Sequence, residues 1–293
     1  MRVTQSMLSN NTLRNLSSSY LKLGTYQDQL SSQKKINRPS DDPVVAFKGI
    51  GYRASLNEVE QYKRNLDEVN NWLENTEDAL DKTNTAVQRV NELVVQANNQ
   101  TLTDSDREQI EKEVEELKKQ IISIANTKVA GKYMFNGSDI YSEPIQYDET
   151  SNPQITTNFK GDYVKVEVSA GVNLTVNTDG SKIFEQLLSD IEGLQADLKS
   201  TDPELGGRLS QLQSHMDTIN SARSSVGATM NRVELIGQRL DSTEIMATKM
   251  VSENEDVDLE EVILNLKTQE SIHQAALSAS ARIMQPTLMD FLG

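Results

Sequence analysis

The fold is decided by residues 59–97, which read VEQYKRNLDEVNNWLENTEDALDKTNTAVQRVNELVVQA. Apolar or small residues recur at every seventh position, and a second series follows three places after the first. The first series is Val59, Leu66, Leu73, Leu80, Val87 and Val94, and the second is Tyr62, Val69, Thr76, Thr83, Val90 and Ala97. Six heptads in succession favour a coiled-coil seam over the face of a globular helix. The Thr and Ala residues make this seam thin.

Three further stretches alternate apolar steps of three and four, which predicts amphipathic helices. These stretches are 110–124, 184–198 and 205–233, the last interrupted by Arg223. We expect two long antiparallel helices of similar length, with shorter helices filling out an elongated bundle beside them. The long helices are predicted over 43–99 and 203–250, and the shorter ones near 104–130 and 181–199.

Helix starts are marked by local residue pairs. Asp42-Pro43 and Asp202-Pro203 each place an N-cap Asp before a Pro at the first helical position, where the missing N–H of proline costs nothing. Thr103 and Asp106 have the spacing of a capping box, with Asp in place of the usual Glu.

Between the helical stretches, residues 131–180 are rich in Gly, Pro and aromatic residues. Residues 163–169 and 172–177 alternate apolar and polar side chains, as half-buried strands do. Asn136-Gly137 is a two-residue turn signal. We expect a small antiparallel β insert over 138–180, with residues 154–160 as a third strand of a meander.

The two ends of the chain carry opposite charge. Residues 1–40 hold six basic residues and one acid, whereas residues 251–293 hold eight acids and two bases. Each end also has an apolar stripe that it cannot bury alone, so we expect the ends to pair with each other or with neighbouring copies. The predicted assembly stripes are Leu13, Leu16, Tyr20, Leu23 and Leu30 at the N-terminus, and Leu259, Ile263, Leu266, Ile272, Ala276, Ile283, Leu288 and Phe291 at the C-terminus.

Composition excludes several classes of function. The 293 residues include 44 acids and 29 bases, a formal charge of −15 that argues against nucleic acid or an anionic membrane as the main partner. The chain has no Cys, and His215 and His273 have no evident partner in the sequence. Gly49-Ile-Gly51 is too short for a phosphate-binding loop. We predict no enzymatic activity, no cofactor and no small-molecule substrate.

The acids between Glu253 and Glu261 also fail as a metal site. Their spacing lacks the Gly and the terminal bidentate Glu of a calcium-binding loop. We interpret this run as a solvated linker whose acids lie at a helix N-terminus, where the helix dipole favours negative charge. The sequence therefore predicts no metal site.

The two ends of the chain resemble the bacterial flagellar filament and hook-associated proteins. Residues 1–7 and 30–43 carry the N-terminal resemblance, and 288–292 the C-terminal one. The specific part is the elbow Asn37, Arg38, Pro39, Ser40, Asp41, Asp42 and Pro43, which is similar to the hook-associated protein 3 branch of the family. Flagellins tend to have a Gly-Asp-Asp-Ala-Ala type sequence there. Gln33 stands where a Gly is common in the family.

The resemblance covers roughly 1–137 and 181–293, and it implies an organisation. An inner coiled-coil domain would comprise 1–42 and 251–293. A helical rod would comprise 43–137 and 181–250, and carry the 138–180 insert as a variable outer domain. The elbow would cap the helix that begins at Pro43 and set its angle to the inner helix.

The resemblance also implies partners and a place in the cell. Copies of the chain would form a junction ring between hook-associated protein 1 and flagellin, outside the cell and in the flagellum. Export would use the flagellar type III channel, without a cleaved signal peptide. A cytoplasmic chaperone would cover the C-terminal helix first. The terminal helices would order only on assembly, because alone they bury too little apolar area to offset their ordering entropy.

Two alternatives remain open from the sequence. One is a flagellin-type filament subunit, which the elbow sequence and the copy number would distinguish from a junction ring. The other is an intracellular coiled-coil scaffold, because an Arg-containing, Ser-rich start with no acid before Asp28 also looks like a transit peptide.

Overall fold

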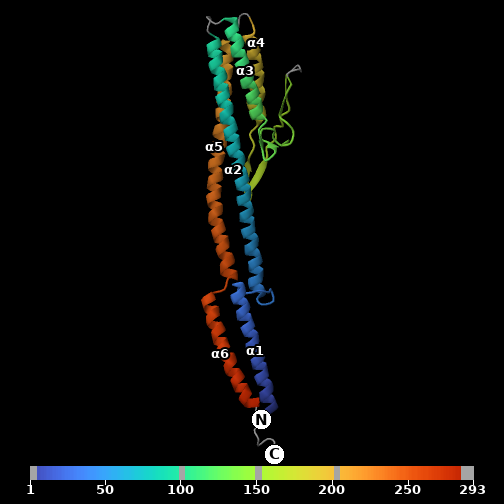
Figure 1. Ribbon diagram of the computed structural model, residues 1–293, viewed down its shortest axis with the longest axis vertical. Coiled ribbons are helices and arrows are strands. Elements are labelled where there is room, and N and C mark those ends of the chain that lie inside the picture. The colour runs from blue at the N-terminus through green and yellow to red at the C-terminus, as the bar shows by residue number, and fades with distance from the viewer. Residues whose placement is uncertain (1–4, 99–102, 149–153, 201–204, 285–293) are drawn as a thin grey trace, which may run out of the picture. The chain divides into compact units, whose positions relative to one another are not determined.

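The computed structural model describes residues 5–98, 103–148, 154–200 and 205–284. Helices dominate it, with a small insert of short strand pairs, so the predicted mainly α fold class is confirmed (Figure 1). The helices are α1 (Gln5–Ser32), α2 (Pro43–Ala97), α3 (Asp104–Ala125), α4 (Gln186–Leu198), α5 (Gly206–Glu255) and α6 (Leu259–Met284), with the π-helical turn η1 (Ser181–Glu185) leading into α4.

The chain forms two compact units. Unit 1 comprises residues 1–58 and 243–293, and unit 2 comprises residues 59–242. The three-part division expected from the sequence stays a prediction. None of the described helices is both long and apolar enough to cross a membrane.

Unit 2 is built on the heptad seam of α2. All positions of the two predicted series are buried except Tyr62, which packs partly buried against the same core. The partners of the seam come from α3, α4 and α5, which lie beside α2 in Figure 1. They include Ile121 of α3, Leu187 of α4 and Ile219 of α5, each at most 1% exposed. The periodic positions read from the sequence are therefore the positions that form one continuous core.

Polar residues within the seam are satisfied locally or by ion pairs. The hydroxyls of Thr76 and Thr83 donate 2.8 Å hydrogen bonds to the carbonyls four residues earlier in α2. Arg223, which interrupts the apolar pattern of α5, donates to Glu77 Oε1 at 2.9 and 2.7 Å and lies 2.9 Å from Asp81 Oδ1. Arg223 thus joins α5 to α2 by charge-assisted hydrogen bonds at the position where the apolar pattern of α5 is interrupted.

The helix starts behave as predicted where the structure describes them. Val44 N and Val45 N donate to Asp42 Oδ1 at 2.9 and 3.1 Å, so Asp42 caps α2. Thr103 and Asp106 form a reciprocal capping box at the start of α3. Asp202-Pro203 lies outside the described residues. Two helix ends differ from the prediction by about five residues: α5 continues to Glu255 instead of stopping near residue 250, and α3 ends at Ala125 instead of near residue 130.

The insert is three separate antiparallel strand pairs, and the predicted three-stranded meander is wrong. The pairs are β1 (Lys128–Val129) with β2 (Lys132–Tyr133), β3 (Ile145–Tyr147) with β4 (Ile155–Thr157), and β5 (Lys165–Ser169) with β6 (Val172–Thr175). The hairpin of β5 and β6 was expected, but the strand within 154–160 pairs with β3 instead of joining that hairpin. Alternation identifies a half-buried strand without identifying its neighbour.

Asn136-Gly137 does not connect two paired strands, as its turn signal suggested. The hairpin turn beside it is Ala130-Gly131, where both residues have positive φ, as a type I′ turn requires. Asn136 is instead fully buried and organises two loops. Its side chain donates to the Ser142 carbonyl at 2.9 Å and accepts from Lys160 N at 3.1 Å. A side chain at Gly137 would collide with the Lys160 carbonyl, which explains the glycine.

Candidate assembly site

Helices α1 and α6 lie side by side within unit 1 (Figure 1). Five residues of the predicted stripes, Leu16, Leu23, Leu30, Leu266 and Ala276, are half-buried there. Fully buried positions are few on both helices, and two of them, Ser19 and Ser280, are polar. The apolar contact between these helices is therefore thin.

The middle of the α1–α6 contact is polar. Gln269 Nε2 donates a 2.8 Å hydrogen bond to the Ser19 hydroxyl, and His273 Nδ1 lies 3.3 Å from the same oxygen. The His273 ring also lies against Tyr20, with 6.2 Å between ring centroids. His273 thus has partners that the sequence did not reveal. A polar group in a helical seam favours one register at a cost in stability.

The other faces of these two helices expose large apolar side chains. Five predicted stripe residues, Leu13, Tyr20, Leu259, Ile263 and Ile272, are exposed. Neighbouring apolar residues that the predicted stripes omitted are exposed as well, namely Met7, Leu8 and Leu21 on α1 and Leu264 and Leu277 on α6. The remaining stripe members, the Ile283 side chain, Leu288 and Phe291, lie outside the part of the chain that the structure describes.

The predicted elbow, residues 37–43, is a hydrogen-bonded turn on the surface. Asn37 N and Arg38 N donate to Asp41 Oδ2 at 3.3 and 3.0 Å, and Asp41 N donates to the Arg38 carbonyl at 3.0 Å. Pro39 and Ser40 are exposed at its tip, and Pro43 is the first residue of α2. Asp41 therefore closes the turn while Asp42 caps the helix, so the two adjacent carboxylates have separate structural roles.

The acidic run that follows α5 contains both solvated and buried groups. Asp258 accepts from Glu260 N and Glu261 N at 3.0 and 3.2 Å, so it caps α6 as the linker interpretation expects. Glu255 contradicts that interpretation, because it is only 4% exposed. Hydrogen bonding from Arg53 holds the pKa of the Glu255 carboxyl below its ordinary value. No pattern in the sequence indicated this pair, because 202 residues separate its members.

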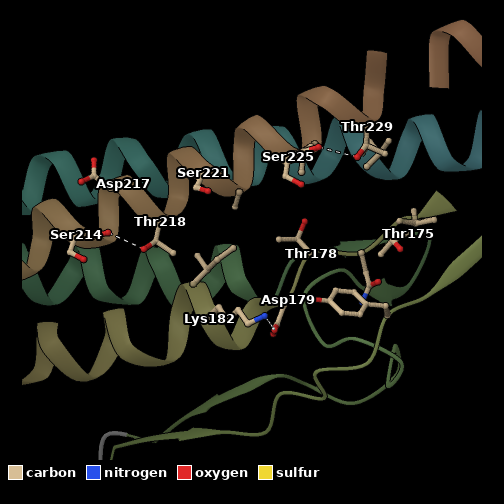
Figure 2. A pocket seen from close by; sticks show the side chains of 17 residues that line it. Thr175, Thr178, Asp179, Lys182, Ser214, Asp217, Thr218, Ser221, Ser225 and Thr229 are labelled. Atoms are coloured by element: carbon tan, nitrogen blue, oxygen red, sulfur yellow. Dashed lines mark hydrogen bonds and ion pairs between the residues drawn. The ribbon is translucent and has the colours of Figure 1, made fainter. Parts of the chain in front are cut away.

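A groove of about 710 Å³, lined by both polar and apolar side chains, lies in unit 2 between α5 and the insert. Figure 2 shows the hydroxyls of Ser214, Thr218, Ser221 and Ser225 along α5, opposite Asp179 and Lys182. Several of the polar groups at the groove are paired with each other or with nearby backbone. Thr218 and Thr229 bond to carbonyls of their own helix, and Lys182 Nζ lies 3.2 Å from Asp179 Oδ2.

The electrostatics of this groove do not favour proton transfer. Burial alone would raise the pKa of the Asp179 carboxyl, but hydrogen bonds from Ser181 and Lys182 outweigh it and hold that pKa below its ordinary value. A carboxylate kept ionised in this way is a poor acid at neutral pH. Elsewhere in unit 2, His215 Nε2 lies 2.7 Å from Asp190 Oδ2, a partner that the sequence did not indicate. Within the described ranges, no three His, Asp or Glu side chains gather as a metal site.

Comparison with known proteins identifies the family. Residues 3–139 match the bacterial flagellin N-terminal helical region, and residues 209–292 match the bacterial flagellin C-terminal helical region. The chain matches no curated protein sequence with which it was compared.

Solved structures share the fold. A flagellar hook-associated protein from Vibrio parahaemolyticus has a TM-score of 0.67 at 20% identity, covering 74% of this chain and 100% of that one. FlgL from Bacillus cereus has a TM-score of 0.60 at 23% identity, covering 69% and 99% of the two chains. The flagellar junction protein FlgL from Legionella pneumophila has a TM-score of 0.60 at 16% identity, covering 71% and 100%.

The two family matches together span most of the chain, and they include both terminal helices and the long helices of unit 2. The hook-associated structures share the fold of the part of this chain that they cover. The chain belongs to the bacterial flagellin family and is a structural component of the bacterial flagellum.

Proposed function

We propose that copies of this chain form the ring that joins the flagellar hook to the filament. The observation that carries this proposal is the exposed apolar surface of the paired helices α1 and α6. Leu21 of α1 is 68% exposed and Leu264 of α6 is 67% exposed. Exposed apolar patches of this kind mark surfaces that other chains cover. Shared fold with hook-associated and junction proteins supports this place in the flagellum over others.

The energetics of the pair support assembly with neighbouring copies. Ordering each residue of a helix costs about 1–2 kcal/mol of conformational entropy. The α1–α6 contact offers little burial in return, because its centre is the polar group of Ser19, Gln269 and His273. Burial of the outward apolar faces against other copies would supply the missing stabilisation, at about 25 cal/mol for each Å² removed from water.

The partners in this proposal are hook-associated protein 1 on one side of the ring and flagellin on the other. A cytoplasmic chaperone covers the apolar face of α6 before export, and the flagellar type III apparatus carries the chain out without cleaving a signal peptide. Chaperone cover would protect side chains such as Leu264 and Leu277, which are exposed when α6 pairs with α1 alone.

A clean deletion strain tests the proposal. Electron microscopy of the cells is combined with an assay of flagellin in the medium. Hooks without filaments, together with unpolymerised flagellin in the medium, are expected. Normal filaments on the deletion strain would exclude the junction role.

Substitutions in α1 and α6 test which surface assembles. Leu21→Asp places a charge on the outward face, and we expect a soluble chain that fails to restore filaments in the deletion strain. Polar substitution of Leu16 or Leu266, half-buried in the α1–α6 contact, should also prevent assembly. Ser17→Asp is the matched control, since Ser17 is exposed and adds no apolar surface. Restored motility with all the Leu variants would contradict the proposal.

A flagellin-type filament subunit is the second candidate, because both matching family regions are those of flagellin. Copy number separates the two. Quantitative mass spectrometry of sheared flagella should find a small, fixed number of copies per flagellum for a junction ring. An amount that grows with filament length would favour the filament subunit. Membership of the flagellin family argues against the intracellular scaffold.

A further inference from the structure

Residues of α2 and of the segment after α1 meet at the buried carboxylate of Glu255, the last residue of α5. Arg53 of α2 donates from Nε to one carboxylate oxygen and from Nη2 to the other, both at 2.6 Å. Lys34, just after α1, places its ammonium 3.5 Å from Oε2. A buried carboxylate is tolerated only when its charge and its lone pairs are matched in this way. The group therefore has a built geometry and is not a chance surface contact.

The backbone reinforces the same junction. Lys35 N donates to the Glu255 carbonyl at 2.7 Å, and Val257 N donates to the Gln33 carbonyl at 3.1 Å. Lys34 and Asp256 face each other as an antiparallel bridge, and their side chains form an ion pair of 2.7 Å. The segment that leaves α1 is thus paired with the segment that leads into α6.

Helix α2 approaches this junction through a glycine. A Cβ added at Gly49 would lie 2.8 Å from Glu255 Oε1, closer than real side chains pack, and at a tight 3.3 Å from Asn254 Nδ2. Asn254 Nδ2 in turn donates a 3.0 Å hydrogen bond to the Val45 carbonyl. A Cβ added at Gly51, two residues further along α2, would have no neighbouring atom within 4 Å. Gly49 and Gly51 therefore form a matched pair, in which only a side chain at the first would displace Glu255.

We infer that Glu255 is the positioning residue of the assembly surface, fixing the starts of α6 and α2 and the end of α1 in one arrangement within unit 1. The inference rests on the proposed function, because ring assembly needs the apolar faces of α1 and α6 in a single orientation. Without the carboxylate, Arg53 would lose both of its acceptor oxygens at Glu255, and Lys34 would keep only its ion pair with Asp256. The contacts between α2, the end of α5 and the segment after α1 would then weaken, although each helix remained intact.

Hydrogen–deuterium exchange of the purified full chain tests the positioning role directly. Glu255→Gln keeps the size of the side chain and removes its charge. Exchange at Lys35 N and Val257 N should accelerate roughly tenfold or more, while the buried core of α2 in unit 2 exchanges as before. Glu253→Gln is the control, because Glu253 is exposed and lies 3.7 Å from Lys249. Unchanged exchange in Glu255→Gln would overturn the inference.

Gly49→Ala and Gly51→Ala give a second test that leaves all charges in place. Gly49→Ala should loosen the same amides as Glu255→Gln, and Gly51→Ala should not. Equal behaviour of the two Ala variants would contradict the packing argument. If Glu255→Gln fails to fold, seen as fast exchange in unit 2 as well, Arg53→Lys replaces it. That variant keeps the positive charge but loses the paired hydrogen bonds, so a smaller acceleration at the same amides is expected.

Complementation of the deletion strain completes the test. Glu255→Gln and Gly49→Ala should lower the fraction of cells with filaments, whereas Glu253→Gln and Gly51→Ala should match the wild type. Loosened amides with normal filaments would mean that Glu255 does not position the assembly surface. The exchange result does not depend on where in the flagellum the chain lies. The positioning role of Glu255 within unit 1 can therefore be confirmed even if the proposed hook–filament junction function is wrong.

Discussion

The side-chain amide of Gln269 on α6 donates a 2.8 Å hydrogen bond to the buried hydroxyl of Ser19 on α1. With His273 beside the same oxygen, this contact makes the centre of the terminal helix pair polar. A fully apolar seam would hold the two helices more tightly but would allow them to slide in steps of a turn. The polar centre favours one register and leaves the pair weak enough to depend on neighbouring copies.

Ser19→Ala tests that contact. The substitution leaves Gln269 and His273 without their shared partner, which should destabilise the α1–α6 pair by about 1–2 kcal/mol. Faster amide exchange along α6, with unit 2 unchanged, is the expected signature. Ser18→Ala changes an exposed neighbour and should have almost no effect. Similar exchange in the two variants would mean that the polar centre adds nothing to the pairing.

Replacing Gln33 with glycine should increase the stability of unit 1. Its φ is 58°, a left-handed conformation that costs a residue with a side chain about 1–2 kcal/mol. Glycine removes that strain but loses more entropy on folding, so Gln33→Gly should stabilise unit 1 by a net 0.5–1 kcal/mol, roughly. Thermal unfolding followed by circular dichroism measures the change. Gln33→Ala keeps the strain and should not stabilise. A lower melting temperature for the Gly variant would refute this account.

Acid should weaken unit 1. Hydrogen bonds from Arg53 and Lys34 lower the pKa values of Glu255 and Asp256 below their ordinary values of 4.5 and 3.8. A carboxyl with a lowered folded-state pKa stabilises the fold above its unfolded pKa and loses that contribution as pH falls through the folded value. Melting temperatures measured from about pH 7 to pH 3 should therefore fall more steeply for the wild type than for Glu255→Gln. If the melting temperatures of the wild type and Glu255→Gln fell in parallel, the ionisation of Glu255 would not contribute to folding stability.

The parts of the fold that sequence predicts are those whose cause is local. The burial of Leu66, Leu73 and Leu80 follows from a seven-residue period that can be read within one helix. Arg53 and Glu255 lie 202 residues apart, so charge counts could not predict their contact. The pairing of β4 with β3 was missed because alternation identifies a strand without identifying its neighbour. The polar contact at Ser19 was not predicted, because a search for apolar stripes passes over polar residues. Gln33 did carry a signal, since it replaces a glycine that is common in the family.

Lys118 should be a site where removing a charge stabilises the protein. It lies in α3 at 2% exposure, donates a 2.8 Å hydrogen bond to Gln195 Oε1 of α4, and places its ammonium 5.5 Å from the centre of the Tyr147 ring. Burial lowers the pKa of Lys118 and outweighs the attraction of Glu192 and Glu115. Because the unfolded chain then holds the proton more tightly, stability should rise with pH as Lys118 loses its charge in the folded state.

Lys118→Met keeps the length of the side chain and removes both the charge and the pH dependence. It should raise the stability of unit 2 at neutral pH by about 1 kcal/mol, because relief of the buried charge exceeds the cost of leaving Gln195 Oε1 without its donor. Denaturant unfolding near pH 7 and near pH 10 measures both effects. Lys112→Met, at an exposed position of the same helix, should leave stability almost unchanged. Destabilisation by Lys118→Met would instead mean that the bond to Gln195 and the contact with Tyr147 outweigh the cost of burying the charge, and that Lys118 helps to hold α3, α4 and the insert together.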